Sequence, residues 1–171
     1  MNERQLLRRG AVGVALCLIL SHSPIGSHNA YAASAPLQQA LTQQLTAFEA
    51  HRLPIAEFYH LRDGEPAWQA VEAVEALVAA LNGLANDGLV PNDYHADSLL
   101  NEFQRSQAGG ETTQALFDIN ATQSLLLALD HLERGKVNPR DIEPNWTAPR
   151  PERRYSLLRL VHAVEDRDLD S

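Results

Sequence analysis

The stretch 112–134 constrains the fold more than any other part of this 171-residue chain. Its apolar side chains recur at three- and four-residue steps, which is the spacing of one face of an α-helix. They are Leu116, Ile119, Leu126, Leu129 and Leu132. Gly135 follows directly, and glycine is common just past a helix C-terminus. We therefore expect one long helix over residues 112–134.

A second apolar stripe at helical spacing runs from Val71 to Ala85 and stops at Asn86-Asp87-Gly88. Shorter patterns predict helices over residues 36–50, 99–103 and 153–166, the middle one capped by Asp93 or Asp97. Residues 55–61 look extended, and residues 136–150, with three prolines, look irregular. The fold class that we expect is mainly α: a compact helical scaffold of about five helices with one or two short extended segments.

The first 32 residues have the composition of a secretory signal peptide. Arg4, Arg8 and Arg9 form a basic start, residues 10–20 are an apolar run, and Ala30-Tyr31-Ala32 is a small-x-small cleavage site. The apolar run is shorter than the roughly 20 residues that span a bilayer, so a cleaved signal is favoured over an anchor. We expect residues 1–32 to be removed after Ala32 and residues 33–171 to form one domain.

Charge and cysteine content exclude several kinds of function. The formal net charge is −8, and loss of three arginines and Glu3 with the signal takes it to −10. An acidic domain is a poor binder of nucleic acid, whose phosphates demand a basic face, and we expect no membrane association after signal cleavage. The one cysteine, Cys17, lies in the signal. Cleavage therefore removes any disulfide, thiolate metal ligand or cysteine nucleophile.

No motif predicts a cofactor, a metal or a catalytic group. The histidines are scattered over several segments, and none stands in a His-Glu-x-x-His pattern. The oxygen-rich residues 86–95 lack the acidic spacing of an EF-hand loop, and no Gly-x-Ser-x-Gly elbow is present. Asp130, His131 and Glu133 form a titratable cluster at the end of the long predicted helix. The helix dipole favours a cation at a helix C-terminus, which explains His131 as a structural residue. The alternative is that His131 takes part in hydrolysis.

The stretch 58–68 gathers three aromatic residues, a histidine, an arginine and carboxylates. Asp63-Gly64-Glu65-Pro66 within it is a turn signal. We interpret the stretch as a structural corner with Trp68 covering the join between turn and helix, and a ligand site is the alternative. Arg62 could pair with Asp63, Glu65 or a helix C-terminus while its aliphatic stem lies on an aromatic ring.

Four motifs, in order, resemble the N-terminal scaffold domain of the long, periplasmic murein L,D-transpeptidases. The first two are Phe58-Tyr59-x-x-Arg62-x-x-x-Pro66-x-Trp68 and Asp87-Gly88-Leu89-x-Pro91-x-Asp93-Tyr94-His95. The others are Phe117-Asp118-Ile119 and His131-Leu132-x-x-Gly135-Lys136-Val137-x-Pro139. The resemblance covers residues 37–165. From these motifs the following family positions are carried over as structural residues: Tyr59, Arg62, Pro66, Trp68, Asp87, Gly88, Leu89, Pro91, Tyr94, His131, Gly135 and Pro139.

The resemblance implies a periplasmic, non-catalytic part of an enzyme that crosslinks peptidoglycan through a cysteine acyl-enzyme. Full-length members are transferases whose catalytic domain carries a Ser-His-Gly-Cys motif, and this sequence contains none. No catalytic residue is therefore carried over, and the chain alone is not expected to be an enzyme. We expect a domain truncated at its C-terminus, with a transpeptidase catalytic domain or another cell-wall protein as partner and peptidoglycan met only indirectly. A free-standing adapter and an inactive truncated gene product stay open.

Overall fold

The computed structural model describes residues 34–47, 54–149 and 152–169. These residues form seven α-helices and two short 3-10 helices, and they contain no β-strand. The expected fold class, mainly α, is confirmed. The helices are α1 (Ala35–Ala47), α2 (Ile55–Leu61), α3 (Val71–Gly83), α4 (Leu99–Ala108), α5 (Gly110–Arg134), α6 (Pro139–Ile142) and α7 (Leu157–Asp166). The 3-10 helices η1 (Leu84–Asp87) and η2 (Pro91–Tyr94) connect α3 to α4.

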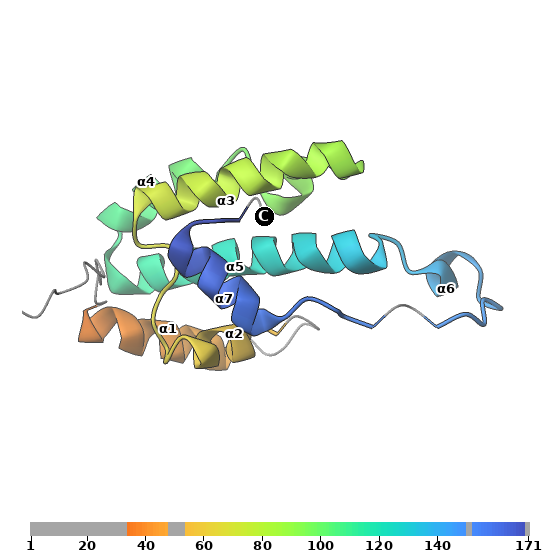
Figure 1. Cartoon of the computed structure of the whole chain (residues 1–171). Coiled ribbons are helices and arrows are strands. Elements are labelled where there is room, and N and C mark those ends of the chain that lie inside the picture. Colours follow the sequence, from red (N-terminus) through yellow and green to blue (C-terminus); the bar gives the residue numbers. More distant parts are fainter. Residues whose placement is uncertain (1–33, 48–53, 150–151, 170–171) are drawn as a thin grey trace, which may run out of the picture. The chain divides into compact units, whose positions relative to one another are not determined.

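Helix α5 is the centre of the fold, because it contacts α1, α2, α3, α4 and η2 (Figure 1). Its buried apolar residues face several directions around the helix, as expected for a helix surrounded by others. They are Ala115, Phe117, Ile119, Ala121, Leu125, Leu126 and Ala128. Three of the seven are alanines, which let neighbouring helices approach closely. The predicted helix 112–134 is thus confirmed, with its start two residues earlier.

The prediction that residues 55–61 are extended is wrong, because they form helix α2. Ile55, Phe58 and Tyr59 are buried together, and their spacing of three and four residues places them on one helical face. This face meets α5 and α7. A seven-residue helix is not stable alone, so tertiary packing and not local propensity decides its structure.

Helix ends differ from the prediction in the connection between α3 and α4. The stripe 71–85 is α-helical only to Gly83 and continues as η1, after which Gly88 has a positive φ of 79°. The N-cap of α4 is Ser98 and neither predicted aspartate, and its hydroxyl donates to Glu102 Oε1 at 2.7 Å. Asp93 instead forms an ion pair with Lys136.

Outer segments complete the described chain. Helix α1 ends at Ala47, and the predicted continuation to residue 50 lies outside the described residues. Helix α7 begins four residues later than predicted, at Leu157, and it packs on α2. Residues 136–149, which we call the arm, contain α6 and no buried residue.

The signal peptide predicted for residues 1–32 lies outside the described residues. Within the part of the chain that is described, no helix combines the length and the apolar character needed to cross a bilayer.

Candidate functional site

A buried polar network joins the corner at residues 58–68 to the middle of α5. The Tyr59 hydroxyl donates to Asp118 Oδ1 at 2.7 Å and lies 2.8 Å from Thr122 Oγ1. Trp68 Nε1 donates to the same Thr122 oxygen at 2.9 Å. Because the single Tyr59 proton goes to Asp118, the Thr122 hydroxyl donates to Tyr59. Every hydroxyl and indole group in this network therefore has a partner.

Asp118 also accepts two backbone bonds from the segment that leads into α3. Ala67 N donates to Oδ1 at 2.9 Å and Trp68 N donates to Oδ2 at 2.8 Å. The Asp118 side chain thus ties three parts of the chain together: α2 through Tyr59, the turn after it, and α5. A carboxylate that accepts several donors is a strong hydrogen-bonding group, and its burial is tolerated only because they are present.

Burial dominates the electrostatics of this network. It raises the pKa of the Asp118 carboxyl above its ordinary value, against the opposing effect of the Ala67 N–H, the Tyr59 hydroxyl and the Trp68 N–H. Asp118 is only 2% exposed. Burial also raises the pKa of the Tyr59 hydroxyl well above its ordinary value, and the nearby Asp118 charge adds to this shift. Tyr59 consequently keeps its proton and stays a donor.

Arg62 closes the turn on its outer side. Its Nε donates to the Glu65 carbonyl at 3.2 Å and its Nη2 donates to the Pro66 carbonyl at 3.1 Å. Nη1 pairs with Glu165 of α7 at 3.1 Å, and the guanidinium lies over the Phe58 ring, 5.8 Å from its centroid. Of the predicted partners, Glu65 takes part through its backbone carbonyl. This arginine therefore fixes the turn and fastens α7 to it.

The second group of family residues forms the connection between α3 and α4. Asp87 and Gly88 are exposed, whereas Leu89 and Pro91 are half-buried. Tyr94, at the end of η2, is fully buried, and its hydroxyl lies 3.0 Å from His131 Nδ1 of α5. The structure thus brings the second and fourth motifs together at the C-terminal end of α5.

The titratable cluster predicted around His131 is divided among separate partners. Asp130 pairs with Arg134 at 2.8 Å and Arg153 at 3.4 Å, while Glu133 accepts the backbone N–H of Arg154 at 2.9 Å. His131 faces Tyr94.

Gly135 and Pro139 lie where α5 gives way to the arm. Gly135 ends α5 with a φ of 78°, and Pro139 opens α6 at the position where proline is best tolerated. This end of α5 is separate from the Asp118 network: nine residues separate Thr122 from His131, which is about 14 Å along a helix.

A tyrosine beside the cluster behaves differently from Tyr59. The Tyr155 hydroxyl is buried, and it has no hydrogen-bond partner among the described residues. The Arg153 guanidinium lies over its ring, 5.7 Å from the centroid. Burial raises the pKa of Tyr155 to about 12, which the Arg153 charge partly opposes. Tyr155 therefore contributes packing and no hydrogen bond.

A hollow of about 280 Å³ lies beside the Asp118 network. Trp68, Phe117 and Asp118 form part of its wall, with the side chains of Gln69, Gln107 and Gln114 around them. Its volume is just below the range for small-molecule sites, which is roughly 300–1,000 Å³. Among the described residues, no group of His, Cys, Asp and Glu side chains could hold a metal ion.

Comparison with protein families decides what kind of domain this is. The family model described as "Scaffold domain" matches residues 54–171, which is more than half of the chain. The chain belongs to the scaffold domain family. The match agrees with the resemblance to the scaffold domain of the L,D-transpeptidases. Neither the curated proteins nor the solved structures gave a match to this scaffold domain.

Sequence reasoning missed the role of two residues of this scaffold domain, Asp118 and Thr122. Asp118 stands in one of the four motifs without a role of its own, and none of these motifs includes Thr122. The available signal was a carboxylate and a hydroxyl four residues apart in the long helix, where they share a face and have apolar neighbours in the sequence. Their partners lie 50 to 63 residues earlier in the chain, so the sequence alone could not pair them.

Proposed function

We propose that this chain is the non-catalytic scaffold portion of a periplasmic L,D-transpeptidase that crosslinks peptidoglycan. Membership of the scaffold domain family over residues 54–171 supports the scaffold part of this proposal. The periplasmic and cell-wall parts rest on the signal-like residues 1–32 and on the resemblance of the four motifs. In this role the chain holds a catalytic domain in position and does no bond-making chemistry itself.

The observation that carries the proposal is that polar groups of the first motif form hydrogen bonds inside the protein. Tyr59 and Trp68 direct their hydroxyl and indole groups to Asp118 and Thr122 inside the protein. A general acid or base must reach the proton that it transfers, within hydrogen-bond distance of the substrate. A carboxylate as buried as Asp118, already bonded to three donors, serves positioning of the backbone instead.

An activity assay tests the scaffold role in two arms. The purified chain alone, incubated with tetrapeptide-bearing muropeptides, is expected to give no crosslinked or trimmed product by liquid chromatography. A separately purified L,D-transpeptidase catalytic domain is then assayed with and without the chain. We expect the chain to increase the crosslinking rate or the melting temperature of that domain.

The control for the second arm is a Tyr59→Phe variant carrying Asp118→Ala, which loses the network and should lose the effect. Turnover by the chain alone would overturn the non-catalytic role. A catalytic domain indifferent to the chain would instead favour a free-standing adapter for another cell-wall protein.

Fractionation tests the location. Expressed with its own first 32 residues in a Gram-negative host, the protein should appear in the periplasmic extract with Ala33 as its first residue by intact mass. A Leu16→Arg variant, which interrupts the apolar run, should stay in the cytoplasm uncleaved. Wild-type protein retained in the cytoplasm at full length would contradict the periplasmic proposal.

A further inference from the structure

The hollow of about 280 Å³ beside the Asp118 network lies between four parts of the fold. Its walls come from α1, from the segment before α3, from the last turn of α4 and from the first half of α5. At about 30 Å³ for each water molecule, this volume corresponds to about nine waters. The hollow is therefore large enough for a small ligand that has a polar end and a short apolar stem.

Three carboxamides from three of these parts line the hollow. They belong to Gln69, Gln107 and Gln114, and no side-chain hydrogen bond joins any of them to another described residue. Each carboxamide has one carbonyl acceptor and two N–H donors. The hollow therefore offers a ligand several polar groups that the described structure does not already use.

Asp118 brings a carboxylate to the same wall, and this carboxylate keeps spare acceptor capacity. Its Oδ1 accepts from Tyr59 and Ala67, whereas Oδ2 accepts from Trp68 alone among the described residues. Each carboxylate oxygen can accept about two hydrogen bonds. Burial raises the pKa of the carboxyl despite these donors, so its negative charge is incompletely compensated in the folded protein. A further donor with a positive charge would complete the compensation.

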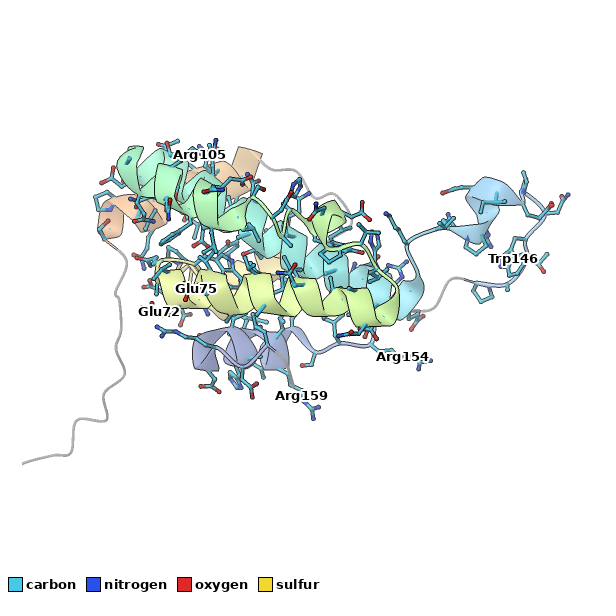
Figure 2. The ribbon with its side chains drawn as sticks, turned by 90° about the horizontal axis from the view of Figure 1, so that it is seen from above. Glu72, Glu75, Arg105, Trp146, Arg154 and Arg159 are labelled. Atoms are coloured by element: carbon cyan, nitrogen blue, oxygen red, sulfur yellow. The ribbon has the colours of Figure 1, made fainter. Side chains whose placement is uncertain are left out.

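The protein does not place such a donor in the hollow. The described residues that line it include no lysine and no arginine. Arg62 lowers the pKa of Asp118 through its charge, but its N–H groups are bonded to two turn carbonyls and to Glu165. Arg105 is exposed on α4 (Figure 2), and two residues that are two positions apart on a helix, as Arg105 and Gln107 are, do not face each other. A cation from outside would therefore meet acceptors and no like charge.

We propose that the hollow binds a small molecule that carries one primary ammonium group on a short apolar stem. The ammonium donates to glutamine carbonyls and to Asp118 Oδ2, which stays an acceptor and transfers no proton. The stem lies against Leu37 and Phe117, which form the apolar part of the wall with Trp68. An organic cation is inferred in preference to a metal ion, because the described residues offer no suitable group of metal ligands. The inference does not depend on the proposed cell-wall function, because purified protein alone tests it.

Nuclear magnetic resonance of ¹⁵N-labelled protein, expressed from the full sequence, tests the site with n-butylamine as the probe. Butylamine is a cation at pH 7, as a lysine side chain is. Addition of the probe at constant ionic strength should shift the indole N–H signal of Trp68 and the carboxamide signals of Gln107 and Gln114 along one binding curve. We expect a Kd of about 1–10 mM, which suits a ligand of so few atoms. A Trp146→Phe variant, in which Trp68 is the single tryptophan, assigns the indole signal.

Two analogues with the same stem separate the effect of charge from the effect of shape. 1-Butanol keeps a hydrogen-bond donor without the charge, and sodium butyrate reverses the charge. Both should bind at least about tenfold more weakly than butylamine, because charge-assisted hydrogen bonds are the stronger ones. Equal affinity for butanol and butylamine would assign the hollow to neutral ligands and reject the ammonium.

Substitutions of Gln107 locate the bound probe, and Gln43 is the matched control. Gln107→Lys puts an ammonium group of the protein into the hollow and should abolish the shifts at Trp68. Gln107→Glu adds a carboxylate and should lower the Kd by about threefold to tenfold. Gln43 is exposed on α1 and does not line the hollow. Gln43→Lys and Gln43→Glu make the same changes in net charge and should leave the Kd within about twofold of wild type.

A Trp68 signal that stays unshifted at the highest butylamine concentration would overturn the proposal. Shifts that persist in Gln107→Lys would overturn it too, because the probe would then be bound elsewhere. Gln107 forms no side-chain hydrogen bond within the described part of the chain, so its variants are expected to fold. Far-UV circular dichroism of each variant separates loss of binding from loss of fold.

Discussion

At the scale of single residues, two tyrosines with buried hydroxyl groups occupy contrasting environments. The Tyr59 hydroxyl bonds Asp118 and Thr122, whereas the Tyr155 hydroxyl has no hydrogen-bond partner among the described residues. A buried hydrogen bond stabilises by about 1 kcal/mol net, and leaving its partners unsatisfied costs more than that. Replacing tyrosine by phenylalanine should therefore affect the free energy of unfolding differently at the two positions.

Tyr59→Phe should lower the free energy of unfolding by about 1–3 kcal/mol, because it removes one hydrogen-bond partner from Asp118 and one from Thr122. Tyr155→Phe is the matched control and should leave the free energy of unfolding unchanged or raise it slightly. Urea unfolding followed by far-UV circular dichroism measures both. Equal losses from the two substitutions would show that the network does not stabilise the fold.

Protonation of Asp118 should contribute to the way the free energy of unfolding changes with pH. Burial raises the pKa of this carboxyl in the folded state, so the folded protein holds its proton more tightly than the unfolded chain does. Stability from this group is then gained as the pH falls through the folded pKa toward the unfolded value, and lost as the pH rises.

The measurement compares wild type with Asp118→Asn, since other carboxylates titrate in the same range. The free energy of unfolding of wild type minus that of the variant should increase as the pH is lowered from 7 toward about 4. A difference that decreases instead would mean that the three donors to Asp118 outweigh its burial.

At the scale of elements, two glycines five residues apart have opposite roles at the end of α3. Gly83 is the last α-helical residue and has a helical φ of −58°, whereas Gly88 has a φ of 79°. A Cβ on either would meet no atom within 4 Å. The two glycines therefore differ in backbone conformation and not in the space available for a side chain.

Gly88→Ala should destabilise the protein by about 1 kcal/mol, because a side chain disfavours the left-handed conformation. Gly83→Ala should stabilise it by about 0.5–1 kcal/mol through helix propensity and a less flexible unfolded chain. Thermal unfolding of the two variants under one buffer condition measures the difference. If both shift the melting temperature in one direction, the helix end assigned at residues 83–88 is wrong.

The sequence predicted the elements that carry a long periodic pattern and missed those that depend on distant contacts. The stripe from Leu116 to Leu132 is local information, and it gave α5 to within two residues of its start. Residues 55–61 offer only two turns, and their helical state is decided by burial of Phe58 and Tyr59 against α5 and α7. Spacing in the sequence cannot report such contacts.

At the scale of the whole molecule, the links between distant segments favour cooperative unfolding. Asp118 joins α2 and the following turn to α5, and Arg62 joins that turn to α7. If one of these helices unfolds, it breaks its hydrogen bonds or ion pairs with the others. We therefore expect them to unfold together in a two-state transition, as most small domains do.

A Trp146→Phe variant should show this directly, because Trp68 is then the single tryptophan and is buried beside Thr122. We expect its fluorescence and the far-UV circular dichroism to change at the same urea concentration. Transitions that separate would reveal a helix that unfolds independently, and a gradual change without a plateau would favour an inactive gene product that barely folds.

The Asp118 network also sets the order in which the molecule assembles as it is made. Tyr59 and Trp68 must wait for Asp118 and Thr122, which follow them by 50 to 63 residues. Until that part of the chain has emerged, α2 has no surface to pack on and a seven-residue helix does not persist alone. Residues 55–68 of a nascent molecule are therefore expected to reach their folded structure only after α5 has been synthesised.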